Sequence, residues 1–250
     1  MPAPRVAPVH LLVMAAGLGT RARRADAAPP KQFDTVAGAS LLLWGVRELA
    51  RAPAVVTVTV AVPEPWLAVA RAELADALLP CAWLVTGGGE TRTESTWLAA
   101  EALCASRPVA AHDLVAVHDA ARPFATRQLL QRVAAAAAAH GAAVPGVPVH
   151  DTVVRLDGES DDCAGAAYLP RAELRALQTP QVFRWAPFLA AHRRAREEGL
   201  DFTDDGGLLA ACGLPPVVVA GEADNWKVTT DADLARAEEL LRRRGAGEAG

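Results

Sequence analysis

Val9-His10-Leu11-Leu12-Val13-Met14-Ala15-Ala16-Gly17-Leu18-Gly19 is the stretch of sequence that decides the fold. Its first part, Val9–Met14, is a short and mainly apolar run, and a glycine-rich segment follows it almost at once. A continuous apolar run of this length suits a strand that is buried on both faces, as in a parallel sheet covered by helices. We therefore expect a sheet to begin here, with a glycine-rich loop at the end of its first strand.

Similar apolar runs alternate with helix-like segments along the rest of the chain. The other strand-like runs are Val55–Val62, Ala82–Val85, Leu114–Val117, Ala142–Val149 and Val217–Ala220. The helix-like segments are Leu41–Arg51, Pro65–Leu79, Thr93–Ala105, Thr126–His140, Ala186–Glu198 and Ala232–Arg244. This alternation predicts an α/β fold with a Rossmann-like, doubly wound and mostly parallel sheet, in which ligands bind at the carboxyl ends of the strands.

One stretch departs from the alternation. Asp151–Leu156 and Gly165–Leu169 are typical of two strands, and Asp157-Gly158 is typical of a turn, so an antiparallel β-arm is expected over residues 150–172. A two-stranded arm is only marginally stable in water. We therefore expect it to protrude from the main sheet and to pack on a second copy of the chain. We otherwise expect residues 1–250 to form a single domain, with Gly245–Gly250 as a flexible tail.

Composition restricts the functional class. The net charge of −4 argues against a general nucleic-acid-binding protein, because such proteins usually present a basic face. The four cysteines are far apart and form no C-x-x-C motif, which is typical of reduced thiols in a cytosolic protein (Cys81, Cys104, Cys163 and Cys212). The apolar run Val9–Ala16 is too short to span a membrane and has no signal-peptide pattern. We expect a cytoplasmic protein that binds neither nucleic acid nor membrane.

The segment Gly17-Leu18-Gly19-Thr20-Arg21-Ala22 fits the pattern G-x-G-x-x-A, so a dinucleotide site has to be considered. That interpretation also requires an acidic residue about 20 positions later, at the end of the second strand. Here the second strand-like run ends near Val62, and Glu64 follows, much further from Gly19 than the motif requires. This spacing counts against a nicotinamide-dependent dehydrogenase.

Basic residues follow the glycines instead. Backbone N–H groups at Gly17 and Gly19 can approach phosphate oxygens closely. Arg21 and Lys31 would then neutralise a triphosphate. The alternative is a glycine-rich surface turn with solvated arginines, and this is what we expect of Arg23-Arg24.

A carboxylate stands at the end of the strand-like run Leu114–Val117, in His118-Asp119-Ala120-Ala121-Arg122-Pro123. Mg²⁺ usually takes one or two carboxylates together with substrate phosphates. Asp119 is therefore a candidate Mg²⁺ ligand, and an N-cap of the following turn is the alternative. We expect His118 to be a core histidine whose hydrogen bonds are satisfied.

These segments resemble the 2-C-methyl-D-erythritol 4-phosphate cytidylyltransferases of the non-mevalonate isoprenoid route. The matches are Ala15-Ala16-Gly17-Leu18-Gly19-Thr20-Arg21, Pro30-Lys31-Gln32, Gly88-Gly89 with Arg92 and Ser95, His118-Asp119-Ala120-Ala121-Arg122-Pro123, Asp151-Thr152, Arg171 with Thr179-Pro180-Gln181, Thr203-Asp204, and Asp224-Asn225-Trp226-Lys227-Val228-Thr229. They follow one another along nearly the whole chain. One such match would be weak, whereas the series is specific.

The resemblance implies transfer of CMP from CTP to 2-C-methyl-D-erythritol 4-phosphate with Mg²⁺, by a homodimer clasped by its β-arms. The implied catalytic residues are Arg21, Lys31 and Lys227. The implied nucleotide-binding residues are Ala15, Ala16, Gly17, Gly19, Gly88, Gly89, Ser95 and Ala120. The implied acceptor-binding residues are Asp119, Arg122, Thr152, Arg171, Thr179 and Thr203, and Asp119 would also bind the metal, with Asp224 as a candidate second ligand.

The sequence departs from the family pattern in three places. Ten positions separate Arg21 from Lys31, which is longer than expected. His150 stands where a basic residue is usual, and Asp205-Gly206-Gly207 stands where a Glu and small residues are expected. Two alternative functions remain: a cytidylyltransferase for another polyol phosphate, such as ribitol 5-phosphate, and a non-catalytic nucleotide-binding protein.

Overall fold

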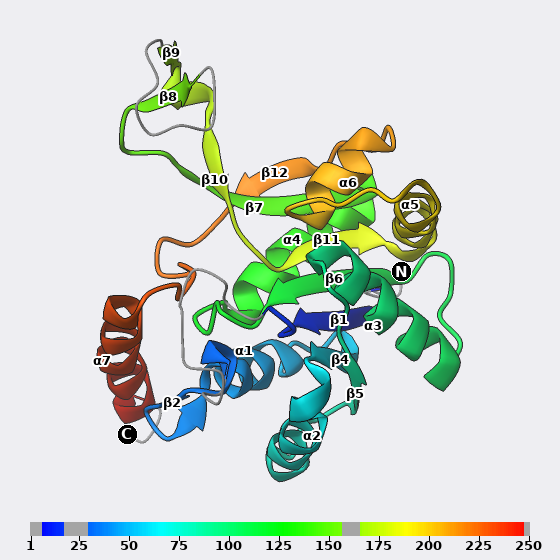
Figure 1. Ribbon diagram of the computed structural model, residues 1–250, viewed down its shortest axis with the longest axis vertical. Helices are drawn as coiled ribbons and strands as arrows, with labels where there is room; N and C mark the ends of the chain where they lie inside the picture. Colours follow the sequence, from blue (N-terminus) through cyan, green and yellow to red (C-terminus); the bar gives the residue numbers. More distant parts are fainter. Residues whose placement is uncertain (1–6, 18–29, 157–165, 248–250) are drawn as a thin grey trace, which may run out of the picture.

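An eight-stranded sheet forms the centre of the protein (Figure 1). The computed structural model describes residues 7–17, 30–156 and 166–247. The sheet consists of β1 (Val9–Met14), β4 (Val55–Val62), β5 (Ala82–Gly87), β6 (Leu114–Asp119), β7 (Ala142–Pro148), β10 (Arg175–Leu177), β11 (Gln181–Arg184) and β12 (Val217–Ala220). The strand order is β10-β7-β11-β6-β1-β4-β5, with β12 paired in parallel to β7. Among the described strands of this sheet, only β10 and β11 run antiparallel to the strands beside them, so the mostly parallel sheet predicted from the sequence is confirmed.

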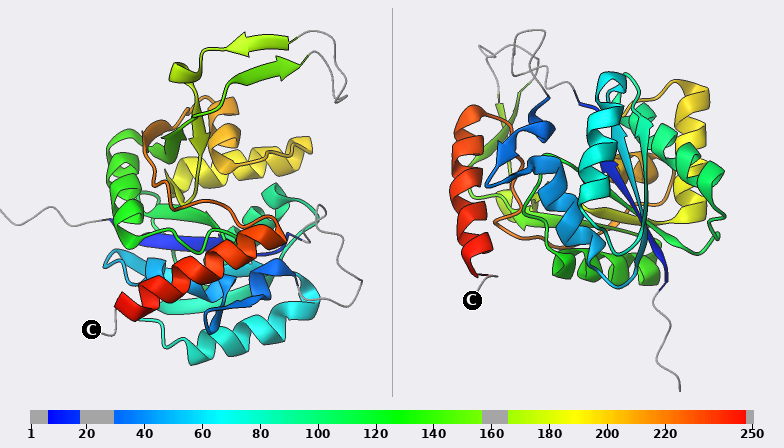
Figure 2. Two further views of the ribbon diagram at one scale, coloured as in Figure 1. Left: turned by 90° about the vertical axis from the view of Figure 1, so that its left-hand side faces the viewer. Right: turned by 90° about the horizontal axis from the view of Figure 1, so that it is seen from below.

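Helices cover both faces of this sheet. They are α1 (Leu41–Ala50), α2 (Leu67–Asp76), α3 (Arg92–Ser106), α4 (Arg127–His140), α5 (Trp185–Glu198), α6 (Asp205–Ala211) and α7 (Asp231–Gly247). One core cluster joins the sheet to α1, α2 and α4, and a second joins it to α3, α5 and α6. Helix α7 packs beside α1 and the hairpin of β2 (Thr35–Val36) and β3 (Ala39–Ser40) (Figure 2). The doubly wound arrangement is therefore confirmed.

Side-chain caps explain where several helices begin. The hydroxyls of Ser40, Thr91 and Thr126 each accept a hydrogen bond from the backbone N–H three residues later, at the starts of α1, α3 and α4. The carboxylate of Asp204 caps α6 in the same way. Such caps satisfy N–H groups that have no partner within the helix. Helix α3 thereby begins at Arg92, directly beside the carboxyl end of the sheet.

The sequence missed several short elements. Strands β10 and β11 have three and four residues, and β10 is exposed throughout, so neither shows a clear apolar period. Helix α6 was missed because its first turn contains Gly206 and Gly207, which are poor helix formers. The predicted tail also begins too early, because α7 continues through Gly247. A helix that has already formed gains one hydrogen bond for each residue it adds, which offsets the low propensity of glycine.

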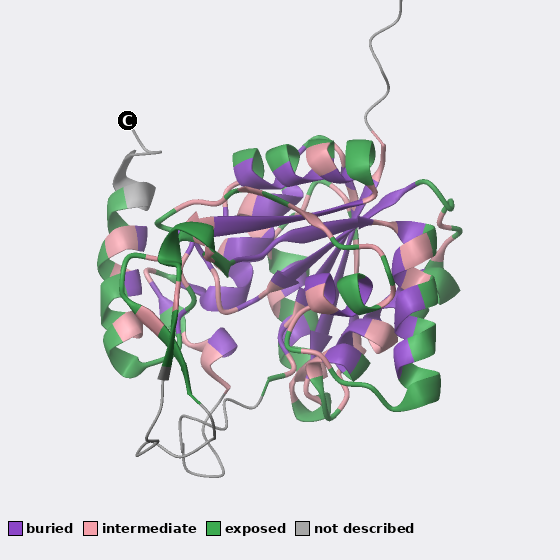
Figure 3. Ribbon diagram, turned by 90° about the horizontal axis from the view of Figure 1, so that it is seen from above, coloured by how far each residue is buried: buried purple, intermediate pink, exposed green. Residues whose placement is uncertain are grey.

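The predicted β-arm is present and stands away from the body of the molecule (Figures 1 and 2). Strands β8 (Val153–Leu156) and β9 (Ala166–Leu169) pair antiparallel in a sheet of their own. The predicted turn Asp157-Gly158 lies outside the described residues. In Figure 3 the central strands are buried and the arm is mainly exposed. Tyr168 on β9 is 77% exposed, and dimerisation through the arm stays a prediction.

Two further expectations concern thiols and membranes. Cys81, Cys104 and Cys212 are free thiols, whereas Cys163 lies outside the described residues. Within the described part of the chain, every helix is too short or too polar to cross a lipid bilayer.

Candidate active site

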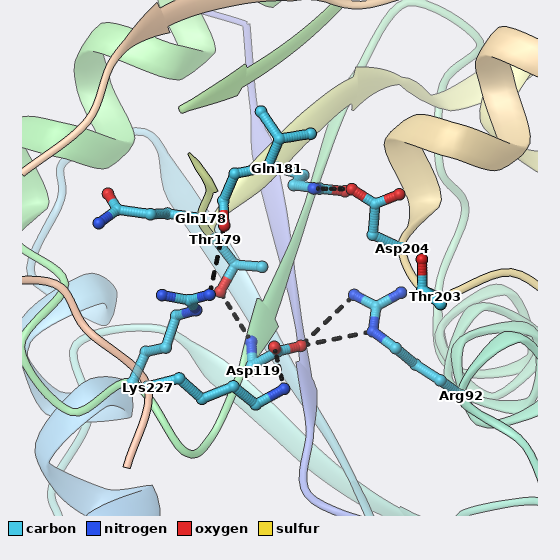
Figure 4. Close-up of a pocket in the computed structure, with 10 residues that line it drawn as sticks. Arg92, Asp119, Gln178, Thr179, Gln181, Thr203, Asp204 and Lys227 are labelled. Atoms are coloured by element: carbon cyan, nitrogen blue, oxygen red, sulfur yellow. Dashed lines mark hydrogen bonds and ion pairs between the residues drawn. The ribbon is translucent and has the colours of Figure 1, made fainter. Parts of the chain in front are cut away.

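A cavity of about 330 Å³ opens at the carboxyl end of β6, where a parallel sheet is expected to bind its ligands (Figure 4). The chain segments around it come from the start of α3, the end of β6, the segment that enters β11, the start of α6, and the segment before α7. Its lining consists of Arg92, Asp119, Arg122, Leu177, Gln178, Thr179, Gln181, Thr203, Asp204 and Lys227. Five of these residues were predicted from the sequence as site residues: Asp119, Arg122, Thr179, Thr203 and Lys227.

Asp119 is the last residue of β6 and holds two cationic side chains. Its Oδ2 accepts a hydrogen bond from Lys227 Nζ at 2.8 Å, and its Oδ1 accepts from Arg92 Nε and Nη2 at 3.4 Å each. The Asp119 side chain is only 13% exposed, whereas that of Lys227 is 45% exposed. The carboxylate therefore orients both cations at the cavity. These hydrogen bonds come from side chains, so they are not those of an N-cap, which would come from backbone N–H groups of the following turn.

The charges set the ionisation of this cluster. Burial favours the neutral acid of Asp119, but Arg92 and then Lys227 outweigh burial and hold the pKa of the carboxyl well below its ordinary value. Burial also opposes the charge on Arg92, but Asp205 and Asp119 outweigh it and raise the pKa of the guanidinium. Asp119 and Arg92 are consequently both charged at any physiological pH.

Thr179 and His118 support the backbone at Asp119. Thr179 Oγ1 accepts a hydrogen bond from Asp119 N at 3.0 Å and donates to His118 Nδ1 at 3.0 Å. His118 Nε2 then donates to the Arg122 carbonyl at 3.1 Å. Burial lowers the pKa of His118 to about 4, so the ring is neutral near pH 7. The prediction of a core histidine with satisfied hydrogen bonds is confirmed.

Arg122 joins the cavity to the segment that carries Lys227. Its Nη1 donates to the Asn225 carbonyl at 2.8 Å, and its Nη2 lies 3.4 Å from the Leu177 carbonyl. Burial lowers the pKa of this guanidinium. Among the described residues its Nε has no partner. Arg122 is thus a half-buried cation that lines the cavity.

The predicted nucleotide-binding residues gather beside the ends of β1 and β5. A Cβ atom on Gly88 would collide with Cβ of Ala16, so only glycine permits this approach of the two loops. Gly89 N donates to Ser95 Oγ at 3.1 Å, and that hydroxyl donates to the Thr91 carbonyl at 2.8 Å. The Ser95 side chain therefore shapes the Gly88-Gly89 loop.

Further predicted residues lie on both sides of this loop pair. Ala15 and Ala120 are buried, and Ala120 N donates to the Met14 carbonyl at 3.0 Å, which continues the alignment of β6 with β1. Gly17 is exposed at the end of the described segment. Gly19 and Arg21, with Arg23-Arg24, lie outside the described residues.

Lys31 does not line the cavity. It begins a 3₁₀ turn, Lys31–Phe33, and its ammonium donates to the Thr229 carbonyl at 2.7 Å and lies 3.5 Å from Asp231. The next side chain, Gln32, donates to the carbonyls of Ala15 and Gly17. Lys31 thus contacts the segment that precedes α7, and Lys227 belongs to that segment.

Thr152 and Arg171 lie on or beside the arm and are not brought to the cavity of their own chain. Both are exposed, and Arg171 Nη1 donates to the His150 carbonyl at 2.8 Å. The structure therefore separates these two predicted acceptor-binding residues from Thr179 and Thr203.

Sequence reasoning assigned no role to five residues that line the cavity: Arg92, Leu177, Gln178, Gln181 and Asp204. Arg92, Gln181 and Asp204 belong to segments that match the family motifs, so the sequence does mark them as candidate site residues. Gln181 Nε2 donates to Asp204 Oδ2 at 2.6 Å, and its Oε1 accepts from Gly206 N at 3.0 Å. Leu177 and Gln178 carried no signal, because a single apolar or amide side chain outside a motif has no distinctive pattern.

Asp119 fits a metal ion that arrives with phosphates better than one held by protein alone. The described residues contain no group of three or more His, Cys, Asp or Glu side chains that could hold a metal ion. Mg²⁺ nevertheless needs only one or two carboxylates when phosphates supply other ligands. Asp224 does not line the cavity, so Asp119 is the candidate that the geometry supports.

Comparison with known proteins shows the family of this chain. The profile of the 2-C-methyl-D-erythritol 4-phosphate cytidylyltransferase family, IspD, matches residues 9–243. The bifunctional IspD/IspF enzyme of Rhodopseudomonas palustris strain HaA2 is 39% identical over 232 residues, which are 92% of this chain and 54% of that protein. The IspD/IspF enzyme of Nitratidesulfovibrio vulgaris strain DP4 is 38% identical over 230 residues, 90% of this chain and 56% of that protein. The chain thus spans little more than half the length of these curated relatives.

In two solved structures, the alignment with this chain extends over almost the whole of both chains. The 2-C-methyl-D-erythritol 4-phosphate cytidylyltransferase of Thermus thermophilus is 36% identical, with a TM-score of 0.73 over 94% of this chain and 99% of that chain. The 4-diphosphocytidyl-2C-methyl-D-erythritol synthase of Anaerococcus prevotii has a TM-score of 0.78 at 24% identity, over 95% of this chain and 97% of that chain, which shows a shared fold. The family profile extends over nearly all the strands and helices described above, and it includes every residue of the cavity. This chain belongs to the 2-C-methyl-D-erythritol 4-phosphate cytidylyltransferase family.

Proposed function

We propose that this chain transfers CMP from CTP to 2-C-methyl-D-erythritol 4-phosphate, giving 4-diphosphocytidyl-2-C-methyl-D-erythritol and pyrophosphate. One observation carries the proposal beyond family membership: the cavity gathers Arg92, Arg122 and Lys227 around the buried carboxylate of Asp119. Guanidinium and ammonium groups are the side chains that best bind phosphate. Two phosphorylated substrates are the ligands that such a cavity suits.

The proposed reaction needs no general base. An oxygen of the acceptor phosphate attacks the α-phosphorus of CTP and forms a new O–P bond. The bond from the α-phosphorus to the oxygen that bridges to the β-phosphorus breaks, and pyrophosphate leaves with the bonding electron pair. The acceptor phosphate is largely ionised near neutral pH, so no proton has to be removed. Catalysis then consists of positioning two anions and neutralising the charge between them.

We assign each predicted site residue a role in binding or positioning the two substrates. Lys227 faces the cavity and is half exposed, so its ammonium can pass from Asp119 to the reacting phosphate. Arg122 binds the acceptor phosphate, and Thr179 and Thr203 contact the acceptor polyol. Ala15, Ala16, Gly88, Gly89 and Ser95 hold the cytidine, with Gly17, Gly19 and Ala120 beside them. Arg21 and Lys31 bind the triphosphate.

We also infer that Asp119 holds Mg²⁺ together with oxygens of the nucleotide. Bound there, Mg²⁺ would neutralise part of the triphosphate charge. The support is the ionised state of Asp119 and its place in the cavity.

The protruding arm supports a proposal about assembly. We infer a homodimer in which the arm of each chain carries Thr152 and Arg171 to the acceptor site of the partner. Exposed apolar side chains on the arm, Val154, Leu156 and Tyr168, are of the kind that such an interface would cover. A cytoplasmic location, proposed from the wide spacing of the cysteines in the sequence, completes this description.

Pyrophosphate release tests the proposed activity. The purified chain is incubated with Mg²⁺, one nucleotide (CTP, UTP, GTP or ATP) and one acceptor (2-C-methyl-D-erythritol 4-phosphate, ribitol 5-phosphate or none). We expect release only from CTP with the methylerythritol phosphate, and none after chelation of the metal. Preference for ribitol 5-phosphate would overturn the acceptor but keep the class. Preference for another nucleotide, or binding of CTP without release, would contradict the class.

A further inference from the structure

A line of buried charged side chains leads from the cavity into the protein and ends in two residues that the proposed reaction does not use. Arg92 contacts Asp119 on one side, and on the other its Nη1 donates to Asp205 Oδ2 at 2.6 Å. His192 Nε2 donates to Asp205 Oδ1 at 3.0 Å. The Asp205 side chain is 1% exposed and that of His192 is fully buried. Neither of these two residues lines the cavity.

The two cations of Asp119 differ in how they are held. The Lys227 side chain is 45% exposed. Among the described residues, its ammonium pairs with one carboxylate, that of Asp119. Arg92 is 21% exposed and is bound by a second carboxylate, Asp205. When substrate phosphates enter, Lys227 is therefore free to leave Asp119, whereas Arg92 is fixed between two carboxylates.

Asp205 is itself held rigidly. The next residue, Gly206, donates its N–H to Gln181 Oε1 at 3.0 Å, which ties the first turn of α6 to β11. A Cβ atom on Gly206 would lie 3.0 Å from a methyl carbon of Val144, so this turn packs closely on the sheet. On the other side, the ring of His192 packs against Phe188 with ring centroids 4.4 Å apart. An ionised carboxylate oxygen can only accept a hydrogen bond, so Nε2 of His192 donates in the bond to Asp205.

We propose that Asp205, backed by His192, is a positioning residue: it fixes Arg92 so that Asp119 stays directed into the cavity after Lys227 has moved to the reacting phosphate. The inference rests on the proposed function and concerns residues that do not contact substrate. It also gives a role to the unusual Asp205-Gly206-Gly207 segment, in which Gly206 permits the close docking of α6 that brings this carboxylate to Arg92.

The variant Asp205→Asn tests the proposal, because Asn is nearly isosteric and removes the negative charge. We expect kcat for pyrophosphate release to fall by about 10–100-fold, as is typical when a residue that orients a ligand-binding side chain is lost. The Kd of CTP, measured by calorimetry without acceptor, should stay within about threefold of wild type, because Arg92 remains charged. If Asp205 only restrained Arg92 from binding phosphate, CTP would bind more tightly and kcat would not fall.

Asp113→Asn is the matched control. Asp113 is also buried and pairs with a histidine, His10, at 3.3 Å, but it lies at the opposite end of β6. It should lose stability as Asp205→Asn does and keep kcat within about twofold of wild type. The double variant R92K/D205N should lose no more kcat than the more damaged single variant, since the two residues act as a unit.

Several results would overturn the proposal. One is a kcat of Asp205→Asn within twofold of wild type, and another is a variant in which only the Kd of CTP changes. A third is a double variant in which the kcat losses of the two single variants multiply. If Asp205→Asn does not fold, His192→Leu replaces it, because leucine suits the apolar surroundings of His192. That variant should lose kcat by about threefold or more, and an unchanged kcat would contradict the role. Absence of turnover in the wild type would contradict the proposed function instead, so the two failures are distinguishable.

Discussion

Lys31 and Lys227 are the two residues whose replacement by alanine we predict to lower turnover most. In Lys31→Ala and Lys227→Ala we expect kcat to fall about 10²–10³-fold, because each removes a charge that stabilises the transition state. The Kd of CTP, measured by calorimetry, should change far less. Arg194→Ala is the control, since Arg194 is paired with Glu198 on the exposed face of α5. Turnover within threefold of wild type in either lysine variant would exclude the role proposed for it.

Asp119→Asn should fold but lose metal-dependent activity. Asn keeps the shape of the side chain, but it lacks the negative charge and presents an N–H₂ group to either Lys227 or Arg92, which are themselves donors. We therefore expect a lower Tm and a severe loss of kcat that added Mg²⁺ does not restore. The measurements are a thermal melt and a titration of activity with Mg²⁺. Near-normal activity at ordinary Mg²⁺ would show that this carboxylate has no part in metal binding.

His118 should make the protein less stable in mild acid. Its pKa is about 4 in the folded chain and 6.5 ordinarily, so the unfolded chain binds more protons between these values and stability falls as pH falls through this window. Between pH 7 and pH 5 this costs about 2 kcal/mol. Urea unfolding at the two pH values should show a smaller loss in His118→Gln than in wild type. His140→Gln, an exposed control at the end of α4, should behave as wild type, and equal losses in His118→Gln and wild type would refute the prediction.

Among the elements, the arm carries a prediction about which chain completes the acceptor site. Arg171 is exposed and lies outside the cavity of its own chain. We predict that Arg171 acts in the partner's site. The inactive variants Lys31→Ala and Arg171→Ala are unfolded together and refolded as mixed dimers. Each heterodimer would then contain one site with both residues intact.

Random mixing with two-fold symmetry makes about half of the dimers heterodimers, so about a quarter of all sites should be active. The control is each variant refolded alone, which should regain no activity. If heterodimers form and activity does not return, Arg171 acts within its own chain. Light scattering of the wild-type chain checks the dimer itself.

At the scale of the whole molecule, ligand binding should appear as thermal stabilisation. A ligand at 100 times its Kd that binds only the folded chain adds about 2.7 kcal/mol. For a chain of this size that corresponds to a rise in Tm of about 5–10 °C. We expect such a rise with CTP and Mg²⁺ and none with NAD or NADP. A rise with the dinucleotides but not with CTP would favour the dehydrogenase alternative.

The sequence by itself determined the α/β class, six strands of the main sheet, six helices and the position of Asp119 at a strand end. These features are local: a continuous apolar run, a helix-like segment and a turn signal are each complete within a short stretch of sequence. The family motifs are local as well. They identified Lys227, Arg122, Thr179 and Thr203, which the fold then brings to one cavity.

Only the tertiary structure decided which charges meet. Arg92 and Asp205 are 113 positions apart, and their contact depends on how the starts of α3 and α6 dock at one end of the sheet. Thr179, in the segment between β10 and β11, and His118, on β6, are likewise brought together across 61 positions. Strands β10 and β11 are stabilised by pairing with longer neighbours rather than by their own pattern. The energy of such contacts comes from burial and from distance in space, and neither of these can be read from the order of residues in a single chain.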